Sequence, residues 1–167
     1  MVMSKGSGSD SIVDFKTMRG RDYPTIRQFS VFLENRVGRL LEIVRRFQNT
    51  SSRIVALNIN DAYECSIVRF VLTHPEQGRE ILERAGLAMI ESDLIAIELP
   101  HVNQPMIEIC EALLQAEINL VQTYPLLVRS HGSMIVALMV DNIELAQETL
   151  ACQGFTMITE NDLLDMS

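Results

Sequence analysis

The segment Phe29-Ser-Val-Phe-Leu33 has a counterpart in Ile95-Ala-Ile-Glu-Leu99, a shift of 66 from position 29 to position 95. Both segments carry apolar side chains at every second position, which predicts β-strands with one buried face. The same shift places one helical stripe on another: Leu40, Ile43, Val44 and Phe47 on Met106, Ile109, Cys110 and Leu113. Each stripe has the i, i+3, i+4, i+7 spacing of a helix that buries one side. The chain is therefore predicted to contain an internal repeat.

The rest of the repeat follows at a shift of 68, from position 67 to position 135, which places Ile67-Val68 on Ile135-Val136. Stretches rich in β-branched and aromatic side chains predict two strands in each copy, joined by a turn. These predicted strands cover 53–60 and 65–73 in the first copy and 119–128 and 133–140 in the second.

A second helix is predicted in each copy from its start and stop signals. Thr73-His-Pro-Glu76 and Asp141-Asn-Ile-Glu144 have the spacing of a capping box, in which the first side chain accepts from a backbone N–H and the glutamate reaches back. Gly86 and Gly154 occupy equivalent places beyond these helices and suit the left-handed position that ends a helix.

Each copy thus has the order βαββαβ, and the predicted fold class is α+β. We expect two tandem ferredoxin-like units, each an antiparallel four-stranded sheet with both helices on one face. The first unit is placed at 27–93 and the second at 94–164, with a loose extension at 1–26 and a tail at 165–167. Units of about 70 residues bury little surface, so a shared core or a partner chain is expected to stabilise them.

The charge balance argues against nucleic acid and membranes as partners. The chain has 14 Lys and Arg against 22 Asp and Glu, a net charge of −8. Phosphate backbones and anionic bilayers attract clustered cations instead. Neither a run of about 18 apolar residues nor a secretory leader is apparent. We therefore expect a cytoplasmic protein.

Neither a metal centre nor a catalytic site is predicted. The three cysteines lie far apart in apolar or helical stretches, so they are expected to be buried thiols in a reducing compartment: Cys65, Cys110 and Cys152. The three histidines are also widely separated, and no nucleophile–base or paired-carboxylate spacing is present. The protein is expected to be no enzyme and to need no cofactor.

The first turn of the repeat has the most specific sequence. The first strand leads into Glu34-Asn-Arg-Val-Gly-Arg-Leu-Leu41, and the amphipathic helix that follows leads to Ser52-Arg-Ile54. This order resembles the ACT-domain pattern of a strand, a polar turn with Gly and Leu, a helix and an Asn-Ile type second strand. The second unit echoes it with Asn119-Leu120. The resemblance covers 27–164; the layout is similar to the small regulatory subunit of acetolactate synthase and, more closely, to stand-alone tandem ACT proteins.

The resemblance implies an amino-acid site between this turn and the second strand of a neighbouring unit, in the same chain or across a dimer. It points to these residues of the first unit: Asn35, Arg36, Val37, Gly38, Arg39, Leu40, Arg53 and Ile54. A helix N-terminus offers free N–H groups to a carboxylate, and Gly38 lets the backbone come close because it has no Cβ. In the alternative interpretation, Gly38 only satisfies a tight turn and Asn35 only caps the helix.

This sequence departs from the family pattern in both units. Val37-Gly38 stands where the family usually has Pro-Gly, and Arg53 where it often has Asn. The second turn reads His101-Val-Asn-Gln-Pro105 and has no glycine. A different polar site is predicted there, from four residues: His101, Asn103, Gln104 and Asn119. The alternative is that the side chains of this loop cap the next helix.

These features favour a small-molecule-binding regulatory protein whose ligand is an amino acid. We expect a homodimer that serves as a regulatory subunit in amino-acid biosynthesis, for example of acetolactate synthase in the branched-chain pathway. The alternative is a ligand-free interaction module. Free edge strands favour that alternative, because two such sheets can pair side by side and remove their open edges.

Overall fold

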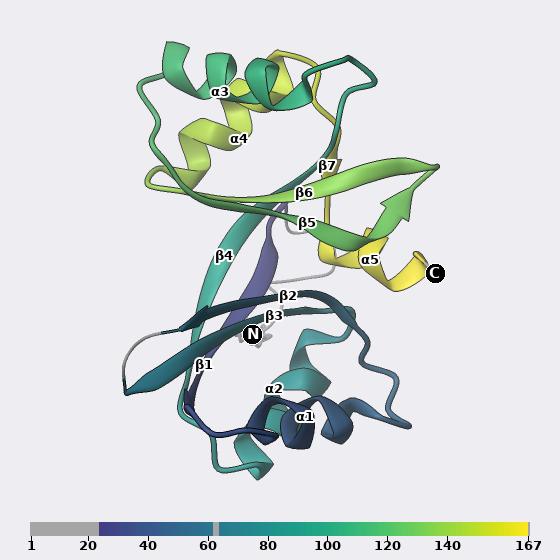
Figure 1. The fold of residues 1–167 in the computed structure, drawn as a ribbon. Helices are drawn as coiled ribbons and strands as arrows, with labels where there is room; N and C mark the ends of the chain where they lie inside the picture. The colour runs from purple at the N-terminus through teal and green to yellow at the C-terminus, as the bar shows by residue number, and fades with distance from the viewer. Residues whose placement is uncertain (1–23, 62–63, 167) are drawn as a thin grey trace, which may run out of the picture.

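The computed structural model describes residues 24–61 and 64–166 (Figure 1). In chain order the elements are β1 (Ile26–Glu34), α1 (Arg39–Val44), the 3-10 turn η2 (Arg45–Phe47), β2 (Ile54–Asp61), β3 (Cys65–Leu72), α2 (Pro75–Arg84), β4 (Met89–Glu98), α3 (Pro105–Gln115), β5 (Leu120–Ser130), β6 (Ser133–Val140), α4 (Ile143–Cys152), β7 (Met157–Ile158) and α5 (Glu160–Asp165). Within the described ranges no helix has both the length and the apolar composition needed to cross a bilayer.

The strands form two antiparallel units that share one strand. The order is β2-β3-β1-β4 in the first unit, and in the second it is β5-β6-β4-β7. Both are the order of a ferredoxin-like βαββαβ unit, which confirms the predicted fold class. β4 pairs with β1 as far as Leu94 and with β6 from Ile95 onward. Since the partners change inside one strand, the bounds 27–93 and 94–164 remain a proposal.

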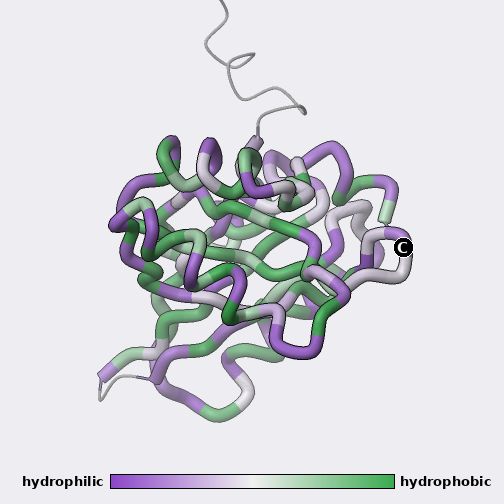
Figure 2. The backbone as a smooth tube through the Cα atoms, turned by 90° about the horizontal axis from the view of Figure 1, so that it is seen from above, coloured by the Kyte–Doolittle hydropathy of each residue, from purple (hydrophilic) through white to green (hydrophobic). Residues whose placement is uncertain are grey.

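The two sheets pack face to face, with the helices on the outer sides. In Figure 1, α1 and α2 lie below the first sheet, and α3 and α4 lie above the second. Three hydrophobic cores result, one under each pair of helices and one between the sheets. Seen from above, the chain alternates between hydrophobic and hydrophilic residues along its elements, as expected for elements with one buried face (Figure 2).

The predicted ends of α2 and α4 are confirmed. Gly86 has a φ of 70° and Gly154 a φ of 87°, both in the left-handed region. Beyond each glycine, the next amide donates back into the last turn of the helix: Leu87 to the Leu82 carbonyl and Phe155 to the Leu150 carbonyl. These are the bonds of a glycine-terminated helix.

The two predicted capping boxes are wrong by one residue. His74 is the N-cap of α2 and makes no side-chain cap bond. Asn142 is the N-cap of α4, and its side chain accepts from the Leu145 amide at 3.2 Å. Thr73 and Asp141, the predicted caps, each lie one position earlier, so neither can reach the helix N–H groups as a cap does.

Thr73 and Asp141 instead hold the start of the second strand in their own units. The Thr73 hydroxyl accepts from the Arg53 amide at 2.9 Å, and the Thr73 amide donates to the Arg53 carbonyl. In the second unit the Asp141 carboxylate accepts from the Asn119 amide at 3.1 Å, and the Asp141 amide donates to the Asn119 carbonyl. The same clasp at equivalent positions confirms the internal repeat.

The predicted burial of the cysteines is wrong for Cys110 and Cys152, which are exposed, while Cys65 is half-buried. In α3 the buried stripe consists of Ile109, Ala112 and Leu113. Cys110 lies one residue, about 100°, around the helix from Ile109, which is outside that stripe. The stripe is narrower than the apolar sequence pattern indicates.

A short helix that the sequence analysis did not predict, α5, closes one side of the core between the sheets. Thr159 and Asp162 form a true capping box at its start, with the Asp162 carboxylate accepting from the Thr159 amide at 2.7 Å. Leu163 is fully buried in the core between the sheets. The capping box orients α5 so that this side chain reaches the core.

A buried ion pair joins α5 to β1. The Arg27 guanidinium donates to both carboxylate oxygens of Glu160, at 2.7 and 3.0 Å, and its third contact is with Glu76 at 2.5 Å. Arg27 is 5% exposed and Glu160 9% exposed. Burial acts to lower the pKa of Arg27, but the hydrogen bonds to the two carboxylates outweigh it and the pKa is raised. Arg27 therefore stays charged at any physiological pH.

We expect Arg27→Met to lower the free energy of unfolding by about 3–5 kcal/mol, because Glu160 then remains buried without its partner. Urea denaturation followed by circular dichroism measures this change. The double variant Arg27→Met/Glu160→Leu should lose clearly less than the sum of the two single variants. Additive losses would show that the two side chains do not interact.

Candidate functional site

The turn between β1 and α1 has the backbone that its glycine predicts. Gly38 has a φ of 85° and is the N-cap residue of α1, where its carbonyl accepts from the Glu42 amide at 3.1 Å. No atom lies within 4 Å of the position that a Cβ would take on Gly38. The Arg39 amide donates to the Arg36 carbonyl at 3.1 Å, but the other N–H groups of a first helical turn lack partners inside the helix. This open turn therefore leaves backbone donors near solvent.

Asn35 does not cap the helix, so this part of the structural alternative is wrong. No side chain makes a cap bond to α1. The side-chain amide of Asn35 donates to the Asp61 carboxylate at 3.0 Å, which connects the turn to the end of β2. The turn therefore lies beside β2, the free edge of the first sheet.

The other side chains of the turn are exposed and paired among themselves. Arg36 and Arg39 both contact the Glu42 carboxylate, at 3.3 and 2.8 Å. The hydrogen bond from Arg39 lowers the pKa of Glu42, and the charge of Arg36 adds to that effect. Val37 is fully exposed, whereas Leu40 packs partly against the core under α1 and α2. Val37, at the tip of the turn, is thus an exposed apolar side chain beside two arginines.

Arg53 and Ile54, the other two residues predicted for the first unit, lie elsewhere in the chain. They line a cavity of about 390 Å³ at the far end of α1, together with Val44, Arg45, Phe47, Gln48, Thr50 and Ser52. The Arg53 guanidinium donates to the carbonyl of Met166. None of residues 35–40 lines this cavity. The eight residues of β2 span about 26 Å between its Arg53 end and its Asp61 end.

The polar site predicted for the second unit is not assembled. His101 lies next to Ser133, with its Nε2 3.0 Å from the hydroxyl, and Asn103 and Gln104 are exposed. Asn119 lies beyond the opposite end of α3, held by Asp141. The capping alternative is wrong as well, because Gln104 occupies the N-cap position without a side-chain cap bond.

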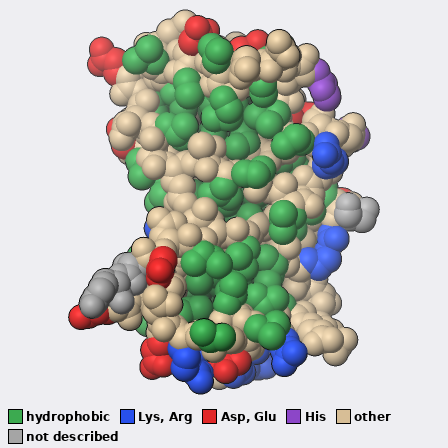
Figure 3. Space-filling model, viewed as in Figure 1, with side chains coloured by type: hydrophobic (Ala, Val, Ile, Leu, Met, Phe, Trp, Pro, Cys, Tyr) green, Lys and Arg blue, Asp and Glu red, His purple; other side chains and the backbone are tan. Residues whose placement is uncertain are grey.

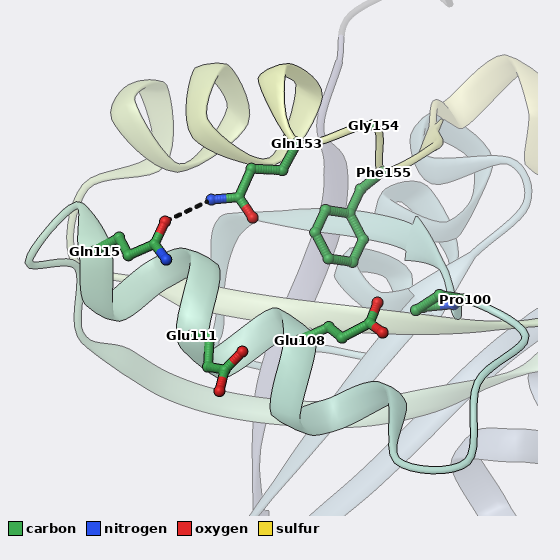
Figure 4. Close-up of a pocket in the computed structure, with 7 residues that line it drawn as sticks. All are labelled: Pro100, Glu108, Glu111, Gln115, Gln153, Gly154 and Phe155. Carbon is green, nitrogen blue, oxygen red and sulfur yellow. Dashed lines mark hydrogen bonds between the residues drawn. The ribbon is translucent and has the colours of Figure 1, made fainter.

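Sequence reasoning missed a pocket beside α3 (Figure 4). It has a volume of about 260 Å³ and is lined by Pro100, Glu108, Glu111, Gln115, Gln153, Gly154 and Phe155. In Figure 4 the Glu108 carboxylate points toward the Phe155 ring and Pro100, and Gln153 donates to Gln115 at 3.1 Å. The two glutamates are one helical turn apart, so their spacing is visible in the sequence. Phe155 lies far from them in the chain, and no sequence pattern predicts that it meets them.

A third cavity, of about 460 Å³, lies between the β5–β6 turn and α5. Arg129 and His131 line it from the turn, and Asp162 and Asp165 from the helix. His131 is almost fully exposed, and its Nδ1 atom lies 3.7 Å from Oε1 of Glu98. The cavity carries both signs of charge, but its charged groups face water and none is a buried side chain without a partner.

The family model of the ACT domain pair matches residues 24–167, which include every residue that the structure describes. The chain belongs to the ACT domain pair family. In such a pair two ACT units occur in one chain, as the shared β4 and the repeated clasps show here. No curated protein sequence is similar enough to this chain to count as a relative.

Solved structures share the fold of this ACT domain pair at low sequence identity. Protein BT0572 from Bacteroides thetaiotaomicron is 21% identical with a TM-score of 0.76, over 84% of this chain and 96% of that one. The ligand-free regulatory subunit of aspartate kinase from Thermus thermophilus is 10% identical with a TM-score of 0.55, over 80% and 95%. A structure of aspartokinase alpha and beta subunits is 14% identical with a TM-score of 0.50, over 77% and 91%.

We expect Gly38→Ala to lower the free energy of unfolding by about 1–2 kcal/mol, because a Cβ strains a left-handed residue even where no neighbour is touched. Gly86→Ala, which also has a positive φ and no nearby atom, should cost about the same. Thermal denaturation of both variants measures the change. A much larger loss for Gly38 alone would mean that its turn is held by contacts absent from this structure.

Proposed function

We propose that this ACT domain pair is an amino-acid-binding regulatory protein without catalytic activity of its own. The observation that carries the proposal is the open Gly38 turn beside the free edge strand β2. Membership of the family supports it, as does the fold shared with a regulatory subunit of aspartate kinase. In this proposal the protein acts in the cytoplasm.

The ligand carboxylate would be bound by the N–H groups of the turn, with Val37 and Leu40 facing the ligand side chain. Arg53 and Ile54 lie at the opposite end of β2 from this turn, about 26 Å away along the strand. They can join the turn only if they come from another chain. We therefore place the site across a homodimer, where the second strand of one copy approaches the turn of the other.

Free edge strands and exposed apolar side chains support such a dimer. Figure 1 shows the two sheets edge-on, with the edge strands β2 and β5 side by side, and the Gln122 amide donates to Asn58 at 3.3 Å between them. Figure 3 shows two hydrophobic areas on this face, one over each unit. Four exposed apolar side chains belong to β2, β5 and α1: Ile59 at 47%, Val121 at 58%, Leu127 at 74% and Leu41 at 51%. Free edges with apolar flanks favour pairing with another chain.

The charges on β2 suit a two-fold arrangement. A cation, Arg53, precedes the strand, and an anion, Asp61, ends it. Antiparallel pairing of β2 with the β2 of a second copy brings Arg53 of each chain near Asp61 of the other. An interface about a two-fold axis joins identical surfaces, so a strand with opposite charges at its two ends is complementary to itself.

We expect the double variant Ile59→Lys/Leu127→Lys to be monomeric, because the new charges would repel across the paired edges. Size-exclusion chromatography with light scattering measures the mass. Leu145→Lys on α4, an apolar residue of similar exposure away from both edges, serves as the control and should remain dimeric. A wild-type protein that is monomeric at tens of micromolar contradicts the dimer.

We expect one amino acid of the standard twenty to raise the midpoint of thermal unfolding by a few degrees. A ligand that binds only the folded state stabilises it by about 2.7 kcal/mol at a hundredfold excess over Kd. Gly38→Val should abolish this shift, while Gly86→Val, a matched left-handed glycine outside the site, should retain it. A flat response to all twenty favours the ligand-free interaction module instead.

The identity of the ligand would decide the pathway. A response to valine, leucine or isoleucine supports a regulatory subunit of acetolactate synthase, and feedback inhibition of that enzyme in the presence of this protein would test it directly. Regulation further requires that the ligand bind two states of the assembly with different affinity, because equal binding shifts no equilibrium.

A further inference from the structure

One face of the first sheet is turned toward the second sheet and carries a cation at its centre. On β3, Val68 and Phe70 belong to the core under the helices, so Arg69 between them points the other way. Burial raises the pKa of the Tyr124 phenol, and the charge of Arg69 is close enough to oppose that rise. Tyr124 belongs to β5, so the Arg69 guanidinium lies between the two sheets.

One nitrogen of the Arg69 guanidinium is buried without a hydrogen-bond partner. This is the Nη1 atom; the residue as a whole is half-buried, and among the described residues no carboxylate forms an ion pair with it. Its neighbours in register are Asn58 on β2 and Ser30 on β1, which are uncharged. A buried donor without a partner costs free energy, and an anion that accepts from this nitrogen would remove that cost.

Arg69 also lies at the limit of the region that the second sheet covers. One register step inward, Gln28 pairs with Val71 and is fully buried, and its side-chain carbonyl accepts from the Tyr124 hydroxyl of the second sheet at 2.5 Å. Toward β4 in the row of Arg69, and along β1 in the next row outward, the second sheet no longer covers this face. Ile90 is 58% exposed and Phe32 39% exposed on the same face.

These outer residues form a continuous apolar shelf beside the cation. Ile90 pairs with Ser30, which in turn pairs with Arg69, and Phe32 pairs with Ile67 in the next row. All of them alternate in phase with Gln28 and Val71, so they share the face that becomes a core further along the sheets. The shelf, defined by Phe32, Ile67 and Ile90, thus continues the core surface into the open.

We propose that Arg69 and this shelf bind a small carboxylic acid with an apolar chain. The guanidinium fork receives the carboxylate, the Ser30 hydroxyl across the strand pair donates to its second oxygen, and the chain lies on Phe32, Ile67 and Ile90. A guanidinium matches a carboxylate in a two-bond geometry that a halide or an alcohol does not offer. This site is separate from the Gly38 turn, and because no carboxylate stands beside Arg69 it offers nothing to an ammonium group.

Isothermal titration of the full chain with acetate, butyrate and hexanoate tests the proposal, with hexanol and inorganic phosphate as probes of the chain and the charge alone. Affinity should rise along the acid series, by up to about fourfold for each methylene that the shelf covers. Hexanoate should bind far more tightly than either hexanol or phosphate. Equal binding of acetate and hexanoate would remove the shelf from the proposal, and equal binding of hexanol and hexanoate would overturn the role of Arg69.

Arg69→Met keeps the length of the side chain and removes the charge, and it should weaken hexanoate binding about 10- to 100-fold. Arg84→Met, an exposed arginine at the end of α2, makes the same change in net charge and should alter binding less than twofold. Ile90→Ser should weaken hexanoate more than acetate. Absence of hexanoate binding to the wild type, or an unchanged affinity in Arg69→Met, overturns the proposal.

Stability without ligand gives a second, independent readout. If the cation has no partner in the free protein, Arg69→Met leaves the unfolding midpoint unchanged or raises it. A clear fall in the midpoint would show that the chain already satisfies Arg69 and would overturn the proposal. Since the amino-acid panel reports on the Gly38 turn and hexanoate on Arg69, either proposal can fail while the other stands.

Discussion

β4 (Met89–Glu98) hydrogen-bonds to β1 through its first half and to β6 and β7 through its second half, so neither sheet can be positioned without the other. Its residues Leu94 and Ala96 belong to the core between the sheets, and burying them requires the sheets to face one another. The helices are then forced to the outer sides. The remaining open side of that core is closed by α5, which the Arg27–Glu160 ion pair holds against β1.

The local elements were predictable because each has a short-range signal. Alternation located β1 and β4, a 3.6-residue period located α1 and α3, and glycines located the ends of α2 and α4. The shared strand was not predictable, since the pattern around 89–98 reads equally well as the end of one unit and the start of the next. The cap errors have a similar cause: Thr73 and Asp141 look like caps in sequence, but each lies opposite the start of a strand that needs its backbone groups bonded.

The candidate site was predictable only in its local part. The conformation of the Gly38 turn follows from one residue type, and the structure has it. Which residues meet that turn depends on the path of β2, which carries Arg53 and Ile54 away from it. The pocket around Glu108 and the cation at Arg69 depend on residues from several elements, and no spacing in the sequence reports such convergence. The buried, unpaired Nη1 atom of Arg69 can be recognised only once both sheets are in place.

The single strand common to both units also has a mechanical meaning. Its ten residues form a stiff rod of about 33 Å with one sheet attached to each half. A twist or tilt imposed on one half is carried to the other without passing through a flexible hinge. The two units are therefore joined by a paired strand and not by a flexible linker, so a displacement of one sheet also displaces the other.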